Sequence, residues 1–145
     1  HYSRFTDEVV LADDSGLVVD ALGGAPGVFS ARFAGPDASD ADRVQKLLRE
    51  MRGKAAAERR ARFICVTAVA RAGRAIAVVS DSASGVITEE PRGAGGFGYD
   101  PVFLFEELGR TYAQLTSDEK NAYSHRGKCF SKLLYMIAPG EVAPS

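Results

Sequence analysis

Three polar segments carry residue types that could act together on a charged, ring-bearing ligand. In the first, Asp13 and Asp14 are adjacent carboxylates at the end of a hydrophobic run, and Ser15 follows them. Mg²⁺ prefers oxygen ligands and keeps waters and substrate phosphates in its shell. This segment therefore predicts a magnesium site, in which Ser15 donates a hydrogen bond to a phosphate or to a metal-bound water.

The same segment also has an interpretation as a simple turn. Successive side chains of an extended strand point to opposite faces, so Asp13 and Asp14 reach one ion only if the strand bends there. Gly16 permits such a bend. In the alternative, Asp14 or Ser15 caps local amides. A serine nucleophile with His125 as its base is disfavoured, because the Gly-x-Ser-x-Gly pattern is absent.

The second segment, residues 95–101, places aromatic rings and a carboxylate among glycines. Phe97 has a glycine on each side, one of them Gly98, and Asp100 follows Tyr99 directly. Such glycines indicate that something approaches the backbone closely. A planar ligand stacked on one of the rings fits this pattern, although both rings could be core residues.

The third segment is a cluster of donors at residues 124–127, with Lys120 just before it. Arg126 offers planar donors suited to a carbonyl or a phosphate, and His125 donates or accepts according to its tautomer. A solvated helix end would explain Lys120 alone but not the whole cluster. Acid, ring and base together predict a site for a charged, ring-bearing substrate.

Short hydrophobic runs separated by glycine predict the strands that position these segments. They span residues 9–12, 17–19, 63–70, 75–79, 86–88 and 102–105. Asp13 and Asp14 would end the first run, and Gly73 permits a hairpin between the third and the fourth. Gly85 is expected to interrupt the strand before the fifth run begins. The glycines of residues 23–27 indicate a loop that passes closely over another element.

Three helices are expected. The first runs from a cap at Asp37 or Ser39 to about Met51, with apolar residues at helical spacing. The second begins at the capping-box pattern of residues 116–119. The third ends at Pro139. Its inward-facing positions would be Phe130, Leu133, Leu134 and Ile137.

Composition restricts the class of protein. The 145 residues suit one domain, residues 1–145, of mixed α/β type with a substantial antiparallel portion. A formal net charge of −1 disfavours nucleic-acid binding. No apolar run approaches the roughly 20 residues that span a bilayer, so no membrane partner is expected. Cys65 and Cys129 are too few for a disulfide framework, and a cytoplasmic protein is expected.

Four segments, in this order, resemble the inosine triphosphate pyrophosphatase family. They are residues 11–17, 22–27 with 30–32, 95–101 and 115–127. The resemblance implies an α/β fold in which a mixed twisted sheet is flanked by helices, with a substrate cleft between two lobes, as in Maf- and Ham-type proteins. It also implies hydrolysis of ITP, dITP and XTP to the monophosphate and pyrophosphate, with Mg²⁺ and commonly as a homodimer.

The resemblance also implies a role for each site residue. Asp14 would be the proton acceptor and a metal ligand, with Asp13 assisting at the metal, and Ser15 would contact the substrate. A physical hypothesis for selectivity follows: donors from Arg126 or Lys120 pair with the 6-keto oxygen of hypoxanthine or xanthine and face the 6-amino donor of adenine. The base pocket would comprise Phe97, Gly98, Tyr99, Asp100, Lys120, His125 and Arg126.

The beginning of the chain departs from the family pattern. The family opens with a buried strand, a Thr-Gly-Asn loop with a nearby lysine, and a helix bearing a metal-binding glutamate, and none of these precedes His1. We expect either a longer protein or a fragment with impaired catalysis, and strand edges exposed by the missing strand. The alternatives are a Maf-type pyrophosphatase for modified pyrimidine or methylated nucleotides, and a catalytically silent nucleotide-binding or dimerising fragment.

Overall fold

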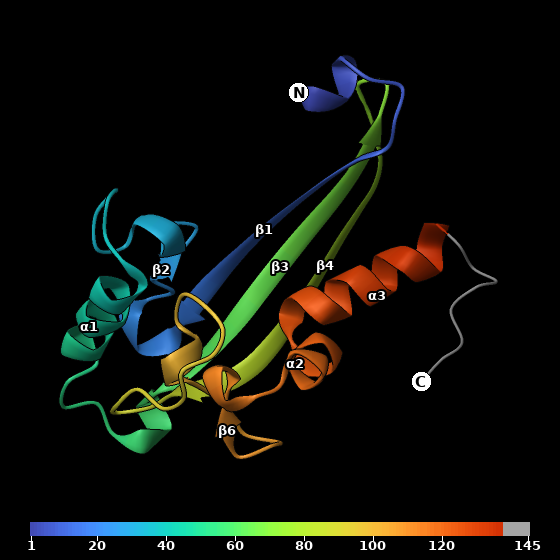
Figure 1. Ribbon diagram of the computed structural model, residues 1–145. Coiled ribbons are helices and arrows are strands. Elements are labelled where there is room, and N and C mark those ends of the chain that lie inside the picture. The colour runs from blue at the N-terminus through green and yellow to red at the C-terminus, as the bar shows by residue number, and fades with distance from the viewer. Residues whose placement is uncertain (138–145) are drawn as a thin grey trace.

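The computed structural model describes residues 1–137, and a long antiparallel sheet forms its centre (Figure 1). The strand order is β2-β1-β3-β4-β5-β6, and every neighbouring pair is antiparallel. The strands are β1 (Val10–Val19), β2 (Pro26–Gly27), β3 (Arg60–Arg71), β4 (Arg74–Ile87), β5 (Phe103–Phe105) and β6 (Arg110–Thr111). With three helices beside this sheet, the predicted mixed α/β class is confirmed.

The first two predicted strands are one continuous strand. β1 runs through the aspartates to Val19, so the predicted end at Asp13 and Asp14 is wrong. Gly16 does not bend the chain there. Its role is close approach, because a Cβ on Gly16 would lie 2.6 Å from the carbonyl oxygen of Gly27. The loop before Gly27 therefore passes closely over β1, as its glycines indicate.

The hairpin of β3 and β4 is confirmed and is longer than the hydrophobic runs alone predict. Ala72 and Gly73 form the turn with positive φ angles of 48° and 78°. β4 continues through Gly85, so the predicted break there is wrong. A Cβ on Gly85 would lie 2.3 Å from the carbonyl oxygen of Leu104, so the glycine admits β5 beside β4.

Both predicted capping signals begin helices. Ser39 caps α1 (Asp40–Glu50) in a capping box with Asp42. Thr116 and Glu119 form the same arrangement at α2 (Ser117–Tyr123). None of the helices within residues 1–137 is both long and apolar enough to cross a membrane.

The third helix, α3 (His125–Ile137), packs on β3 and β4 with a different face from the predicted one. Cys129 and Leu133 are its buried apolar residues, whereas Leu134 and Ile137 are 48% and 52% exposed. The prediction that Leu134 and Ile137 point inward is wrong, because the buried row follows an i, i+4 spacing set by the sheet. The predicted end at Pro139 lies outside the described residues.

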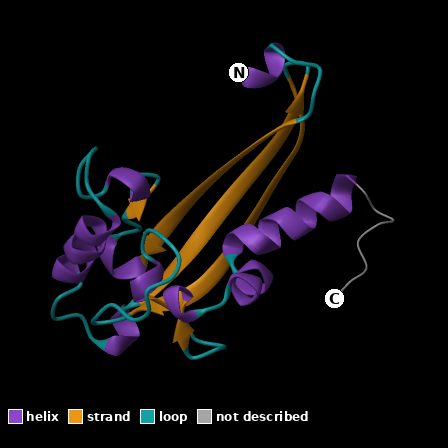
Figure 2. Cartoon of the chain, viewed as in Figure 1, coloured by secondary structure: helices purple, strands orange, loops and turns teal. Residues whose placement is uncertain are grey.

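Two clusters of buried side chains hold these layers together. Figure 2 shows most helices gathered at one end of the strands, while α3 lies along them. The larger cluster, at that end, contains Leu17, Leu47, Phe63, Phe103 and Tyr112 among others. The smaller one lies under α3 and contains Cys65, Val69, Val79, Cys129 and Leu133.

A buried arginine joins α1 to the end of the sheet. Arg59 is 7% exposed and donates hydrogen bonds to three carbonyl oxygens, those of Ile87 at 2.6 Å, Met51 at 3.0 Å and Thr88 at 2.8 Å. Within the described part of the chain no carboxylate forms an ion pair with it. The carbonyl dipoles therefore stabilise the buried guanidinium.

Arg59→Met should lower the free energy of unfolding by about 2 kcal/mol or more, because buried carbonyl oxygens lose their donors. Urea denaturation measures this loss. Arg60→Met is the matched control, since the ion pair of Arg60 within residues 1–137 is an exposed one with Glu106 at 3.3 Å, and such pairs contribute little. Equal losses in the two variants would contradict the assigned role of Arg59.

Candidate active site

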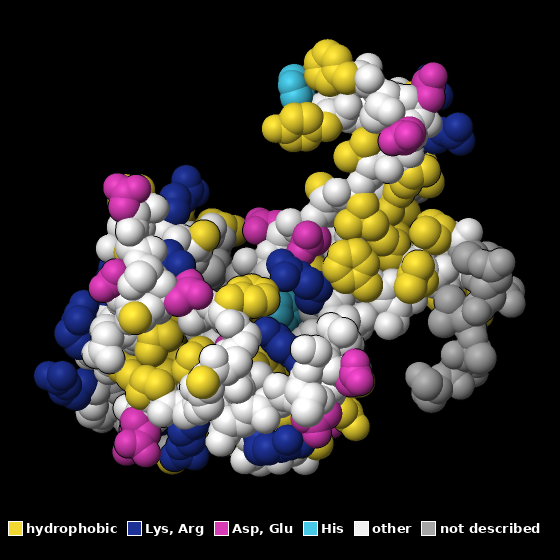
Figure 3. Space-filling view, viewed as in Figure 1, with side chains coloured by type: hydrophobic (Ala, Val, Ile, Leu, Met, Phe, Trp, Pro, Cys, Tyr) yellow, Lys and Arg dark blue, Asp and Glu magenta, His cyan; other side chains and the backbone are white. Residues whose placement is uncertain are grey.

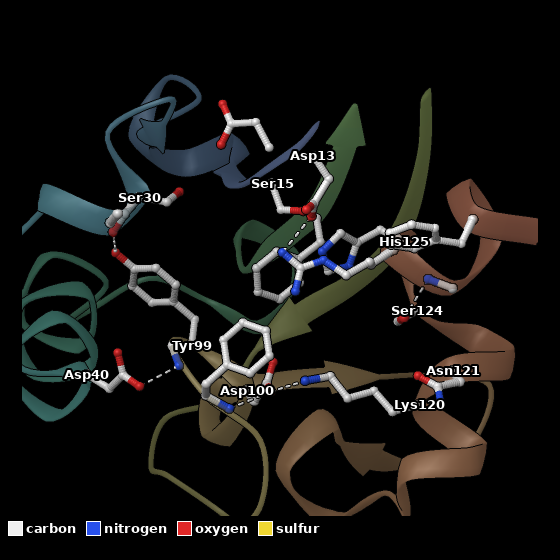
Figure 4. Close-up of a pocket in the computed structure, with 18 of the residues that line it drawn as sticks. Asp13, Ser15, Ser30, Asp40, Tyr99, Asp100, Lys120, Asn121, Ser124 and His125 are labelled. Carbon is white, nitrogen blue, oxygen red and sulfur yellow. Dashed lines mark hydrogen bonds and ion pairs between the residues drawn. The ribbon is translucent and has the colours of Figure 1, made fainter. Parts of the chain in front are cut away.

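A cavity of about 710 Å³ lies between α1 on one side and α2 and α3 on the other (Figure 4). All three polar segments of the sequence line it. Phe97 and Asp14 therefore share one cleft. Figure 3 shows basic and acidic side chains together around a hollow at the centre of the face of the molecule that it presents. The predicted site residues in its wall are Asp13, Asp14, Ser15, Phe97, Gly98, Tyr99, Asp100, Lys120, His125 and Arg126.

β1 sends its two adjacent carboxylates to opposite faces of the sheet. Asp13 is paired in register with Thr67, which is fully buried under α3, and Asp14 with Val66, which is exposed. The Asp13 carboxylate forms an ion pair with Arg126, Oδ2 to Nη2, at 2.8 Å. Asp14 forms no ion pair within residues 1–137.

These positions limit what could hold a divalent cation. The strand does not bend, so the condition under which Asp13 and Asp14 would share one ion is not met. Within residues 1–137 no three acidic, histidine or cysteine side chains converge as a metal site. Mg²⁺ commonly takes only one or two carboxylates besides waters and phosphates. Asp14, without a competing ion pair, fits as one such ligand.

Asp100 organises the aromatic segment. Its carboxylate is 3% exposed, accepts a hydrogen bond from the Phe97 N–H at 2.9 Å and forms an ion pair with Lys120 (Figure 4). A Cβ on Gly96 would lie 2.0 Å from the Asp100 Oδ2, so the turn needs glycine there. The Phe97 ring stays 61% exposed, with the Lys120 Nζ 4.3 Å from its centroid. This ring is available for stacking.

Tyr99 is a core residue, which was one of the two interpretations that the sequence left open for Phe97 and Tyr99. It is 4% exposed, belongs to the larger core cluster and donates a hydrogen bond to the Ser30 carbonyl oxygen at 2.7 Å. Burial raises the pKa of its hydroxyl well above the usual value. Tyr99 therefore fixes one end of the segment, and Phe97 is its exposed aromatic residue.

Asp40 was missed from the sequence, where it is only an acidic residue in the first turn of a helix. In the structure its Oδ2 accepts a hydrogen bond from the Gly98 N–H at 2.8 Å (Figure 4). Its other oxygen pairs with Arg43, and that hydrogen bond, followed by the Gly98 N–H, lowers the pKa of Asp40. The first residue of α1 thus holds the aromatic segment from the opposite side of the cavity.

The break between α2 and α3 directs the donor cluster into the cavity. Ser124 has extended backbone angles, so Lys120 and Ser124 do not share a helix face. A Cβ on Gly127 would lie 1.7 Å from the Asn121 carbonyl oxygen, so only glycine lets α3 begin this close to α2. The new helix starts with His125.

His125 is buried in its neutral form. Its ring is 7% exposed and stacks on Phe63, with centroids 4.6 Å apart. Burial, and then the positive charges of Arg126 and Lys120, lower the pKa of His125 to about 4. The imidazole therefore carries one donor and one acceptor at neutral pH.

Three buried polar atoms of cavity residues have no hydrogen-bond partner within the described part of the chain. They are Ser15 Oγ, His125 Nδ1 and Arg126 Nε. A buried polar atom without a partner destabilises a protein by about 1–3 kcal/mol. Three of them around one cavity indicate that the cavity receives a polar ligand.

Comparisons with known proteins agree on one family. The profile of the Ham1 family matches residues 1–136. A curated dITP/XTP pyrophosphatase of Geobacillus kaustophilus (strain HTA426) is 57% identical over 131 residues, which are 90% of this chain and 64% of that protein. The dITP/XTP pyrophosphatase of Shigella flexneri is 47% identical over 142 residues, 97% of this chain and 72% of that protein.

Solved structures show the same similarity. A HAM1 protein from Coxiella burnetii superposes with a TM-score of 0.87 at 41% identity, over 95% of this chain and 71% of that chain. The Staphylococcus aureus Ham1 protein has a TM-score of 0.87 at 37% identity, over 96% and 71%. The chain thus spans less than two thirds of the Geobacillus protein and somewhat more of the others.

Stability should fall between pH 6.5 and pH 4 because of His125. Its pKa is about 4 when folded and 6.5 when unfolded, so on acidification the unfolded chain takes up the proton first. The contribution is complete above pH 6.5 and is lost as the pH falls toward 4. Urea denaturation should give about 2 kcal/mol less stability at pH 5.0 than at pH 7.5. In His125→Gln this difference should shrink, whereas His1→Gln, at an exposed histidine, should retain it.

Asp40→Ala should loosen the aromatic segment. Loss of a charged acceptor should speed hydrogen exchange of the Gly98 amide about tenfold, measured by NMR. Asp42→Ala is the matched control, because Asp42 lies in the same turn but serves the capping box with Ser39. The control should weaken α1 and leave Gly98 unchanged. If both variants changed Gly98 alike, helix stability would explain the effect instead.

Proposed function

The chain belongs to the Ham1 family, and we propose that the protein hydrolyses non-standard purine nucleoside triphosphates, ITP, dITP and XTP, to the monophosphate and pyrophosphate. The family membership agrees with the resemblance found in the four sequence segments. The observation that carries the proposal is one cavity lined by the exposed Phe97 ring, by the Lys120 and Arg126 cations and by Asp14, which forms no ion pair within residues 1–137.

At the base end, the purine stacks on Phe97 and its 6-keto oxygen accepts hydrogen bonds from Arg126 or Lys120. Adenine presents a 6-amino donor to the same donors, so binding it would leave buried donors unpaired. His125 supports this selectivity, because a neutral imidazole adds a donor and an acceptor without a further charge. Asp100 keeps Lys120 beside the ring.

At the phosphate end, Asp14 accepts the proton of the water that attacks the α-phosphorus. Ser15, which lies on the same face of β1 as Asp13, contacts the substrate through its Oγ. Asp14 would also be a ligand of Mg²⁺. When bound, the ion supplies positive charge that offsets the charge developing on the pyrophosphate. Ser15 fits its role because its buried hydroxyl lacks a partner within residues 1–137.

The active protein is proposed to be a cytoplasmic homodimer. Apolar side chains of the β3–β4 hairpin face water at Val66, Ile76 and Val78. A second subunit would remove such surface from water, which is the usual reason for a contiguous exposed apolar patch. The two cysteines are buried free thiols, as expected in a reducing compartment.

Pyrophosphate release tests this function with a panel of ITP, dITP, XTP, ATP, GTP and UTP in Mg²⁺. The kcat/KM for ITP, dITP and XTP should exceed that for ATP and UTP by about 100-fold or more, because unpaired donors penalise the wrong base. Asp14→Asn should abolish turnover and retain heat stabilisation by IMP. Asp7→Asn, at an exposed acid outside the cavity wall, is the control. Equal rates on ATP or UTP would refute the proposed substrate class.

A further inference from the structure

The Asp13 carboxylate is directed toward the base end of the cavity. Asp13 lies on the face of β1 that α3 covers, and its Oδ2 is 2.8 Å from Arg126 Nη2. Figure 4 shows Asp13 beside Ser15, with a dashed line to this guanidinium. The two side chains are only 28% and 40% exposed, so the pair is partly shielded from water.

Arg126 has no other acidic partner within residues 1–137. The first turn of α3 contains no acidic residue, and the cation Lys120 lies on the same aromatic ring. A long arginine side chain without a partner would keep many rotamers, and repulsion from Lys120 would push it away from the ring. The Asp13 carboxylate opposes both effects.

The pair leaves donors of Arg126 free for a ligand. A guanidinium has five N–H donors in a planar fork, and Asp13 takes those at Nη2. The carbon at the centre of the guanidinium lies 5.6 Å from the centroid of the Phe97 ring. One end of the guanidinium is therefore held by β1 while its other donors remain beside the ring on which a purine would stack.

We propose that Asp13 is a positioning residue for Arg126 and determines discrimination between keto and amino purines. The two adjacent carboxylates of β1 thus have different roles. Asp13 positions Arg126 at the base end, and Asp14 acts at the phosphate end. This assignment rests on the proposed function and replaces the expectation that Asp13 assists at the metal. The physical reason is the alternation of side chains along an unbent strand.

Binding of inosine and adenosine in the presence of EDTA tests the proposal without phosphate, metal or turnover. Calorimetry should show that wild-type protein binds inosine more tightly than adenosine. Asp13→Asn should weaken inosine binding about tenfold, because a displaced Arg126 would lose about one charged hydrogen bond to the base. Adenosine binding should change less than about twofold, because adenosine does not use the Arg126 donors.

Asp81→Asn is the matched control. Asp81 on β4 forms an ion pair of the same length, 2.8 Å, with Lys132 on α3, but neither residue lines the cavity. The control breaks a sheet-to-α3 ion pair and should leave inosine binding unchanged. Thermal unfolding of both variants shows that each is folded.

A double variant tests whether Asp13 acts through Arg126. In the Arg126→Gln background, Asp13→Asn should cause no further loss of inosine affinity. Unchanged or tighter inosine binding by Asp13→Asn would overturn the proposal, as would an equal loss in Asp81→Asn or additive losses in the double variant. Wild-type protein without any preference for inosine would instead overturn the proposed function, and this inference with it.

Discussion

The Asp100 carboxylate connects the two segments that the cavity most depends on. It is almost fully buried, closes the turn around Phe97 through a backbone N–H and pairs with Lys120. A buried carboxylate is stable only when such partners compensate for lost water. The turn and the helix α2 are therefore held together by the same charge. Exposure of the Phe97 ring follows from this, because the turn directs it away from the core.

Charge pairing then distributes the groups around the cavity. Three acid–base pairs surround it, Asp13 with Arg126, Asp100 with Lys120 and Asp40 with Arg43. Each pair fixes a cation and neutralises part of its field, and His125 remains uncharged among them. Asp14 differs, since no ion pair within residues 1–137 engages it. The cavity wall therefore contains paired acid–base groups and, in Asp14, one carboxylate that no cation of the described residues neutralises.

Several glycines lie where a distant segment of backbone passes so closely that a side chain would not fit. Gly16 admits the loop that ends at Gly27, Gly85 admits β5, and Gly127 lets α3 start against α2. In the sequence, Gly16 was interpreted as a bend and Gly85 as a break, and Gly127 was only part of the donor cluster. The distinction depends on which distant backbone passes by. Local glycine signals therefore marked Gly16 and Gly85 as special positions, and only the fold showed that their role is close contact.

Local signals determined much of this protein. Both capping boxes, the hairpin at Gly73 and the four family segments were readable because they depend on residues within a few positions of one another. Tertiary structure decided where strands end and which face of α3 is buried. It also decided the partners of Arg59, Asp40 and Asp13. They depend on pairing between segments far apart in the chain, and a single sequence carries no signal for the register of that pairing. The sequence alone thus predicted most of the chemical groups that line the cavity, but not Asp40, and folding decided which of them bind one another.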